Sequence, residues 1–159
     1  MHDESKWIRF EDYAVIERVP TVAEYCRLRI GAGLTAKDPL AAELGLARTL
    51  YGVCIEHRGE AIGMGRVIGD GGVFFDVVDI AVMPNHQKKG LGKAIMDALM
   101  SYIRRTARPT AWISLMAGPG VTEFYQRYGF IARGADRPGM SFMVGADRAQ
   151  PSSELPTSR

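Results

Sequence analysis

The sequence predicts a mixed α/β domain, and three of its features indicate this class. Residues 49–83 contain three runs of apolar and β-branched residues separated by glycine-containing turns, as in an antiparallel meander. Residues 90–108 place an apolar side chain at every fourth position, which is typical of a helix that packs against a sheet. Residues 21–34 form another helix-like segment ahead of the meander. A sheet flanked by helices is therefore expected.

The N-terminal part is expected to form one strand and two helices. Residues 12–19 alternate between apolar and polar side chains, which predicts a strand. Thr21 and Glu24 have the spacing of a capping box, so the first helix is expected to begin there. Pro39 suits the first turn of a second helix, which is expected to continue to about Arg48.

The meander is expected to consist of strands at residues 49–57, 60–70 and 73–83. Arg58-Gly59 is the predicted hairpin turn between the first two strands. The third strand is apolar on both faces except at Asp76 and Asp79. This pattern favours a central strand that is covered on both sides.

The C-terminal part begins with the helix at residues 90–108, whose apolar stripe is Leu91, Ile95, Leu99 and Ile103. We then expect a strand, a short helix, two short strands and a tail, at residues 110–117, 120–129, 130–134, 139–144 and 145–159. The tail lacks apolar periodicity and is rich in Ser and Pro, so it is predicted to be disordered. One domain is therefore expected over residues 1–144.

Composition narrows the classes of function. The chain has 159 residues, 20 of them basic and 18 acidic, and this balance does not indicate nucleic acid or a membrane surface as a partner. The chain has neither a membrane-spanning apolar run nor a secretory leader pattern, so a cytoplasmic location is expected. Cys26 and Cys54 are expected to be free core thiols, and two cysteines alone make no zinc site. No metal is predicted.

The segment "PNHQKKGLGKA", residues 84–94, has the features of an anion-binding loop. It joins the end of a strand to the start of a helix, where the first N–H groups lack partners and the helix dipole is positive. Gly90 and Gly92 allow a ligand to approach the backbone closely. Positive charge comes from Lys88, Lys89 and Lys93. The segment therefore predicts a phosphate site built from main-chain amides.

Two other phosphate-binding motifs do not fit this segment. A P-loop requires Ser or Thr after its lysine, but Ala94 follows Lys93. The dinucleotide fingerprint requires a third glycine, and Ile95 occupies that position.

Residues 78–100, "VDIAVMPNHQKKGLGKAIMDALM", resemble the central motif of the GNAT superfamily of N-acetyltransferases. The motif has Gln or Arg, two residues, Gly, one residue, and Gly or Ala, which here is Gln87 to Gly92 after Ile80-Ala81-Val82. A second block, "EFYQRYGF" at residues 123–130, is similar to the family's tyrosine, glycine and phenylalanine block. The order of the expected elements agrees with the family from about residue 12 to 144.

The resemblance implies a mixed sheet that splays after its fourth strand, has helices on both faces and holds acetyl-CoA in the opening. An amine would attack the thioester directly through a tetrahedral intermediate, and the backbone N–H of Val82, freed by a bulge, would stabilise the oxyanion. Ile80 would bind the pantetheine arm through its main chain. The resemblance assigns acetyl-CoA binding to Ile80, Ala81, Val82, Gln87, Lys88, Lys89, Gly90, Leu91, Gly92, Lys93 and Tyr125.

Proton transfer requires an acid and a base. Tyr125 matches the family's acid, which protonates the leaving thiolate, although a role as a core aromatic is the alternative. Asp79 is our candidate base because it lies on an apolar strand three residues before Val82; a structural role is the alternative. Strict alternation puts Asp76 and Asp79 on opposite faces, so at most one is expected to face the acceptor, unless the bulge shifts that register.

Two arginines and one aspartate are the candidates for binding the acceptor. Arg29 and Arg66 lie in otherwise apolar settings and are candidates to bind a carboxylate of an amino-acid-like amine; surface exposure or pairing with Glu is the alternative. Asp76 is a further candidate for substrate binding. The predicted activity is N-acetylation of a small primary amine. Acetylation of a protein N-terminus or lysine, a non-enzymatic coenzyme A sensor, and a homodimer all stay open.

Overall fold

The computed structural model describes residues 8–10, 12–141 and 143–144 of the chain. Within these residues six strands form one sheet, and they follow each other in chain order. The strands are β1 (Ile8–Phe10), β2 (Tyr13–Ile16), β3 (Tyr51–His57), β4 (Glu60–Gly69), β5 (Phe74–Val82) and β6 (Trp112–Ser114). The helices are α1 (Val22–Gly31), α2 (Pro39–Leu46), the 3-10 helix η2 (Pro84–His86), α3 (Leu91–Thr106) and α4 (Thr122–Gln126).

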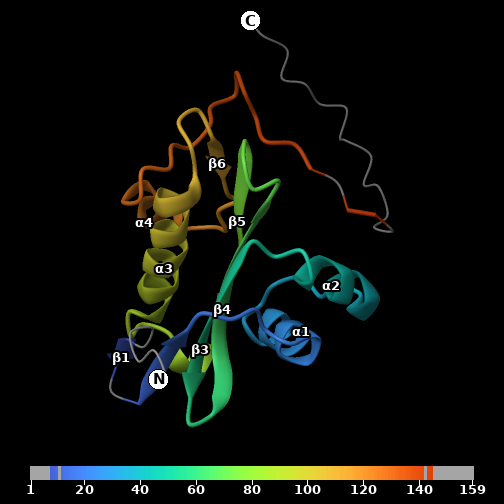
Figure 1. The fold of residues 1–159 in the computed structure, drawn as a ribbon, viewed down its shortest axis with the longest axis vertical. Coiled ribbons are helices and arrows are strands. Elements are labelled where there is room, and N and C mark those ends of the chain that lie inside the picture. Colours follow the sequence, from blue (N-terminus) through green and yellow to red (C-terminus); the bar gives the residue numbers. More distant parts are fainter. Residues whose placement is uncertain (1–7, 11, 142, 145–159) are drawn as a thin grey trace, which may run out of the picture.

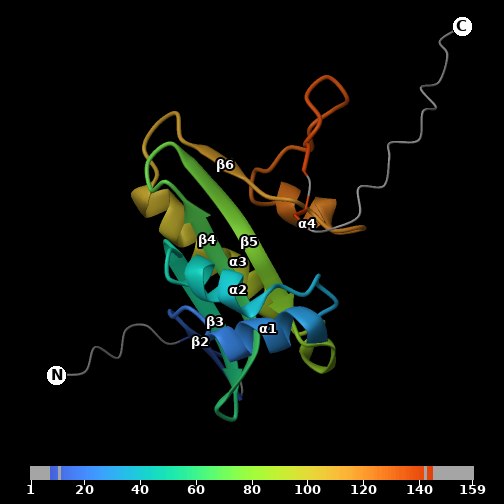
Figure 2. The same ribbon diagram turned by 90° about the vertical axis from the view of Figure 1, so that its right-hand side faces the viewer.

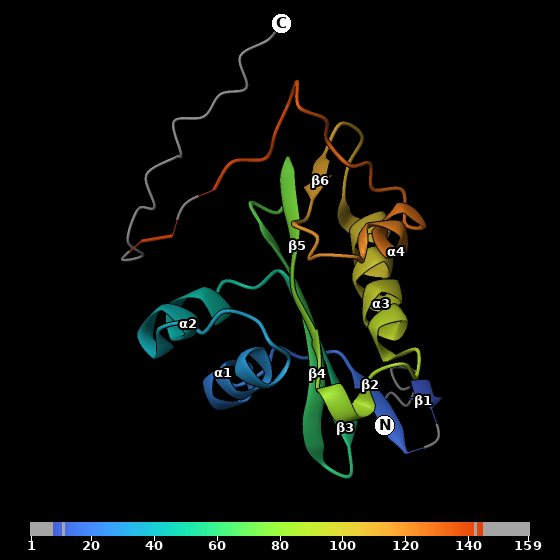
Figure 3. The same cartoon turned by 180° about the vertical axis from the view of Figure 1, so that it is seen from behind.

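Helices cover both faces of the sheet, as the sequence predicts. Figure 1 shows α1 and α2 on one side of the strands and α3 and α4 on the other, and Figure 3 shows the same division from behind. The helices α1 and α3 both pack on β4 and β5, which makes these two strands the centre of the molecule. Among the described helices, none combines the length and apolar character that crossing a membrane requires.

The helix and turn signals in the sequence act locally as expected. The side chain of Thr21 accepts a hydrogen bond from the Glu24 amide, and the Glu24 carboxylate accepts one from the Thr21 amide, so the capping box is formed. Arg58 and Gly59 both have positive φ, 51° and 81°, as a two-residue hairpin turn requires.

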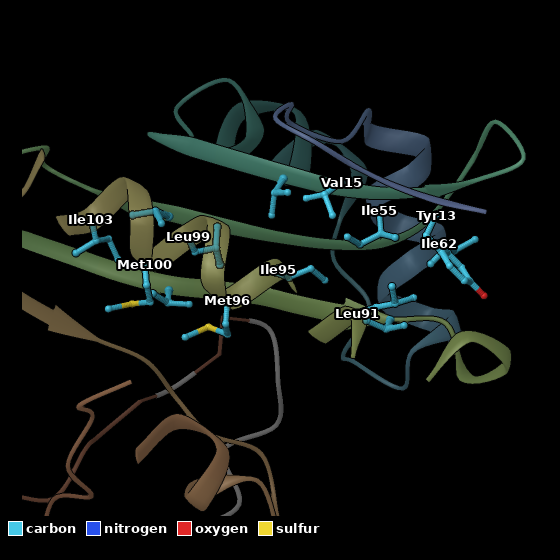
Figure 4. Close-up of a cluster of buried hydrophobic side chains, with 14 of the residues drawn as sticks. Tyr13, Val15, Ile55, Ile62, Leu91, Ile95, Met96, Leu99, Met100 and Ile103 are labelled. Atoms are coloured by element: carbon cyan, nitrogen blue, oxygen red, sulfur yellow. The ribbon is translucent and has the colours of Figure 1, made fainter. Parts of the chain in front are cut away.

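The larger core lies between α3 and the sheet (Figure 4). The predicted stripe on α3 is buried throughout, together with Met96 and Met100 of the same helix. Gly65 of β4 lets α3 approach closely, because a Cβ there would lie 2.4 Å from Cγ2 of Ile95. The smaller core lies under α1 and α2 and consists of Tyr25, Leu28, Ala42, Leu46, Ala61, Met64 and Ala81.

The sheet splays between β5 and β6, which is the opening expected after the fourth predicted strand. These two strands pair in parallel, and only from Phe74 to Asp76 on β5. The rest of β5, as far as Val82, has no partner on that side within the described strands. Figure 2 shows β5 and β6 close together at one end and diverging toward α4.

Three expectations differ from the structure. The strand β1, which pairs with β2, is absent from the sequence prediction because three residues carry no readable periodicity. The strand expected at 130–134 does not form, and the described residues of 139–144 are not in a strand. Ile131 and Met140 are exposed there, so their apolar character reflects no strand of this sheet. The predicted tail, 145–159, lies outside the described residues.

Candidate active site

A β-bulge interrupts β5 at the edge of the opening. Met64 of β4 pairs with Ala81, but Arg66 pairs with Val78, so Asp79 and Ile80 together face Gly65 alone. Asp79 has φ of 57°, the left-handed region that few residues other than glycine adopt and that Asp tolerates better than most. The extra residue shifts the register of β5, so it changes which side chains lie on each face of the sheet and which backbone groups point toward β4.

The bulge directs the Val82 amide into the opening. The Met83 amide donates to the Ile62 carbonyl over 2.8 Å, so Met83 and Ile62 form a hydrogen-bonded pair. Val82, opposite Gly63, then belongs to a non-hydrogen-bonded pair, whose N–H and C=O point away from the partner strand. On that side the Val82 carbonyl accepts a hydrogen bond of 2.9 Å from the Gln87 side chain. The Val82 N–H points outward from the same edge of β5, which has no partner strand at this position among the described strands.

The Asp79 carboxylate is held between two arginines. Its Oδ1 accepts hydrogen bonds from Nη1 of Arg29 and from the Tyr25 hydroxyl, the latter over 3.3 Å. Its Oδ2 accepts a hydrogen bond from Nε of Arg66 over 2.7 Å and forms an ion pair with Nη2 of Arg66 at 2.6 Å. The Asp79 side chain is only 7% exposed. Arg29 and Arg66 therefore converge, but on a carboxylate of the protein itself.

The two arginines are buried, and neither alternative from the sequence describes them. Arg29 and Arg66 are 8% and 7% exposed, and each pairs with Asp79 instead of Glu. The ring of Tyr25 lies 5.6 and 5.3 Å from the two guanidinium carbons. Burial and the nearby Asp79 carboxylate raise the pKa of Tyr25, because both disfavour a phenolate. Tyr25 was missed as a site residue, although it lies one helical turn before Arg29.

A cavity of about 1110 Å³ lies beside this cluster, between β5 and the β6–α4 segment. Of the residues predicted for the site, Arg29, Arg66, Asp76, Asp79, Ile80 and Tyr125 line it. Strict alternation would put Asp76 and Asp79 on opposite faces, but the bulge shifts that register, the exception stated with the prediction, and both side chains line the same cavity. Asp76 accepts a hydrogen bond from Ser114 of β6, a residue that the sequence analysis did not select.

The surroundings of Tyr125 in α4 are compatible with both roles that the sequence left open. Its ring packs edge-on against Phe124 and Phe130, with centroids 5.1 and 6.4 Å away. It also lines the cavity, and its hydroxyl makes no hydrogen bond to a described residue. Burial raises the pKa of Tyr125, so the phenol stays protonated at neutral pH and can donate a proton.

The glycine loop forms the N-terminus of α3. Gly90 is the N-cap with φ of 79°, and the bond from the Ala94 amide to the Gly90 carbonyl is the first of the helix. The amides of the first turn have no intrahelical acceptor, and no side chain of the described residues caps them. A Cβ added at Gly90 or Gly92 would meet no atom within 4 Å. The backbone at Gly90 and Gly92 is therefore open to close approach, as an anion site requires.

Four other residues predicted to bind acetyl-CoA make contacts within the protein. The Gln87 amide donates to the Pro84 carbonyl over 3.2 Å, so it is not free for a ligand. Lys93 pairs with Asp97 at 2.6 Å, and Lys89 lies 5.8 Å from the ring centre of Tyr13. Ala81 is opposite Met64 and packs in the smaller core, so it faces α1 and not the opening.

Comparisons with known proteins agree with this geometry. Residues 48–132 match the family model of the acetyltransferase (GNAT) domain. The structure of SA2161 from meticillin-resistant Staphylococcus aureus, described as a probable acetyltransferase, is 39% identical with a TM-score of 0.78, over 82% of this chain and 98% of that one.

Two curated relatives come from plants. GCN5-related N-acetyltransferase 1, chloroplastic, of Arabidopsis thaliana is 32% identical over 114 residues, which are 70% of this chain and 56% of the relative. Serotonin N-acetyltransferase 2, chloroplastic, of Oryza sativa subsp. japonica is 35% identical over 60% of this chain and 46% of the relative. The chain spans about half the length of these curated relatives.

Proposed function

The chain belongs to the GNAT family of acetyltransferases, and from this premise we propose that it transfers the acetyl group of acetyl-CoA to the primary amine of a small molecule. The observation that carries the proposal is the bulge in β5. It turns the Val82 N–H toward the opening between β5 and β6, and Tyr125 lines the cavity in that opening. Acetyl-CoA supplies an activated thioester, and the residues of this chain bind it, orient it and stabilise the developing charge.

The N-terminus of α3 fits the pyrophosphate of acetyl-CoA. The free amides of Leu91, Gly92 and Lys93 and the helix dipole favour an anion at this end. The missing side chains of Gly90 and Gly92 leave the approach open. Lys88, Lys89 and Lys93 add positive charge around the loop, and Gln87 holds the loop to the end of β5 through the Val82 carbonyl.

Val82 and Tyr125 act on the two atoms that become negative. When the amine nitrogen attacks the thioester carbon, charge develops on the carbonyl oxygen, and the Val82 N–H donates to it. When the carbon–sulfur bond breaks, the thiolate takes the Tyr125 hydroxyl proton. The phenol regains a proton from the solvent in the cavity or from the acylated ammonium, which loses one.

Asp79 is poorly placed to act as a base, because both of its carboxylate oxygens are engaged by guanidinium groups. Accepting a proton there would break an ion pair. We therefore propose that Asp79 fixes the bulge and the two arginines, and that its role as a base is secondary to this. Water in the cavity is then the first acceptor of the amine proton.

A small acceptor is consistent with the name of the rice relative, a serotonin N-acetyltransferase. The test is release of the coenzyme A thiol from acetyl-CoA with a panel of small primary amines, and with peptides that carry a free N-terminus or lysine. The N-acetylated form of the best amine, which has no nucleophile, is the control. We expect turnover with small amines.

Each other result of that panel identifies a different activity. Turnover with peptides alone would make the chain a protein acetyltransferase. Binding of acetyl-CoA without turnover of any amine or peptide would make it a coenzyme A sensor. The plant relatives are described as chloroplastic, so the cytoplasmic location expected from the sequence stays a prediction.

A further inference from the structure

The buried cluster on α1, β4 and β5 carries one uncompensated positive charge. Arg29 and Arg66 are both more than nine-tenths buried, and Asp79 is the one acid within 4.0 Å of either guanidinium among residues 8–10, 12–141 and 143–144. Two cations and one anion leave a net charge of +1. Burying a charge without a counter-ion is unfavourable, so a site of this composition favours an anionic ligand.

The excess charge belongs to Arg29. All three nitrogens of Arg66 are engaged, Nε and Nη2 with Asp79 and Nη1 with the Thr49 hydroxyl over 2.7 Å. Arg29 donates from Nε to the Thr35 carbonyl over 2.6 Å and from Nη1 to Asp79. Arg29 therefore has a guanidinium nitrogen, Nη2, with no hydrogen-bond partner among the described residues, on a side chain that lines the cavity.

The lining of the cavity as a whole carries more positive than negative charge. Its cationic residues are Arg29, Lys37, Arg66, Arg133 and Arg137. Its acidic residues are Asp76 and Asp79, and both are hydrogen-bonded within the protein. Lys37 lies two residues after Thr35, whose carbonyl binds Arg29, so the two cations belong to one corner of the cavity. Such a field attracts an anionic acceptor and repels a polyamine.

On this basis we propose that the acceptor is a primary amine that also carries a carboxylate or phosphate group, which Arg29 and Lys37 bind. The proposal rests on the proposed function and specifies its substrate class. Asp79 neutralises Arg66 and orients Arg29, and the anionic group of the acceptor completes the charge balance. Its amine then extends along the cavity toward the opening beside Val82 and Tyr125.

The first experiment compares matched pairs of acceptors by their kcat/KM in the thiol-release assay. The pairs are phenylalanine and 2-phenylethylamine, lysine and 1,5-diaminopentane, and O-phosphoethanolamine and ethanolamine. Because a hydrogen bond to a charged group is strong, the anionic member of at least one pair is expected to be favoured by about 10- to 100-fold. The carboxylate and phosphate pairs distinguish the two anionic groups.

The outcomes separate this inference from the proposed function. If no amine is acetylated, the proposed function fails. If the uncharged member of every pair is the better substrate, acetyl transfer stands and the anionic acceptor is wrong.

Two variants test the residues. Lys37→Ala removes an exposed cation of the cavity, and we expect it to raise KM for the anionic acceptor several-fold and to reduce the kcat/KM ratio between the anionic and uncharged members of a pair. Arg108→Ala, which removes an exposed cation outside the cavity lining, is the matched control. Arg29→Gln removes the excess charge and leaves Arg66 and Asp79 as a neutral pair, so it is expected to fold and to lose the preference. An unchanged preference in both Lys37→Ala and Arg29→Gln would overturn the assignment.

Discussion

At the scale of single residues, Asp79 contributes to the site through both its backbone and its side chain. Its backbone takes the left-handed conformation that forms the bulge, and its carboxylate is the counter-ion of Arg29 and Arg66. Asp tolerates positive φ better than most residues, so the same position can serve both. The geometry of the Val82 amide and the charge of the acceptor cavity therefore depend on one residue.

Asp79→Asn tests the importance of this counter-ion. Asn keeps the shape and the tolerance of positive φ but leaves two buried guanidinium groups without a carboxylate. We expect a loss of about 3–5 kcal/mol in the free energy of unfolding, measured with urea. Asp76→Asn, on the same strand but exposed, should change stability by less than about 0.5 kcal/mol. If Asp79 acts chiefly as a base, the Asn variant will instead keep its stability and lose turnover.

Tyr125→Phe tests the proposed acid and keeps the aromatic packing with Phe124 and Phe130. We expect turnover to fall by about 10²-fold, the scale of general acid catalysis, with acetyl-CoA binding by calorimetry unchanged. Tyr128→Phe is the matched control, because the Tyr128 hydroxyl donates to Asp97 over 2.8 Å and Tyr128 does not line the cavity. Equal turnover in the two variants would return Tyr125 to a packing role.

At the scale of elements, α3 shows what a sequence can specify. Its apolar stripe, its glycine N-cap and the strand before it are all local patterns, and the observed helix begins one residue from the predicted start. The convergence of Arg29 and Arg66 could not be read in the same way. Their common partner lies 50 residues from one and 13 from the other in the chain, and it reaches both only because a bulge rotates it.

The two short strands predicted near the C-terminus do not form, for a related reason. Residues 130–134 and 139–144 have apolar side chains in strand-like runs, but a strand also needs a partner edge, which local patterns do not reveal. β6 itself pairs over only three residues with β5. Likewise, the period-two rule places Asp76 and Asp79 on opposite faces of a regular strand, whereas the bulge in β5 puts both side chains on the same face.

Gly65→Ala tests the contact between β4 and α3 opposite the bulge. The new Cβ would lie 2.4 Å from Cγ2 of Ile95 and 3.1 Å from Cδ1 of Leu99, and both side chains are fully buried. Overpacking of this kind is expected to lower the free energy of unfolding by about 1–3 kcal/mol. Gly45→Ala in α2, where the Cβ meets open space, should be neutral or stabilising. Equal stability of the two variants would mean that α3 can shift without penalty.

At the scale of the whole molecule, the two faces of the sheet have different tasks. The face under α3 holds the larger core and ends in the glycine loop, whereas the face under α1 and α2 holds the smaller core and the arginine cluster. β4 and β5 both contribute to the two faces, and on β5 Val82 packs on the α3 side and Asp79 on the α1 side. The bulge is where the cofactor side and the acceptor side of the proposed reaction meet.

This division predicts how the fold responds to acetyl-CoA. A ligand that binds only the folded chain stabilises it by about 2.7 kcal/mol at a concentration 100 times its Kd, so the melting temperature should rise by several degrees. Gly92→Val fills the space in front of the first turn of α3, and we expect it to raise the Kd for acetyl-CoA at least about tenfold and to reduce this thermal shift. Gly45→Val is the control, because it makes the same helical substitution where a Cβ also meets open space, away from the loop. A Gly92→Val protein that melts as the wild type does without ligand, and is stabilised equally by acetyl-CoA, would place the pyrophosphate elsewhere.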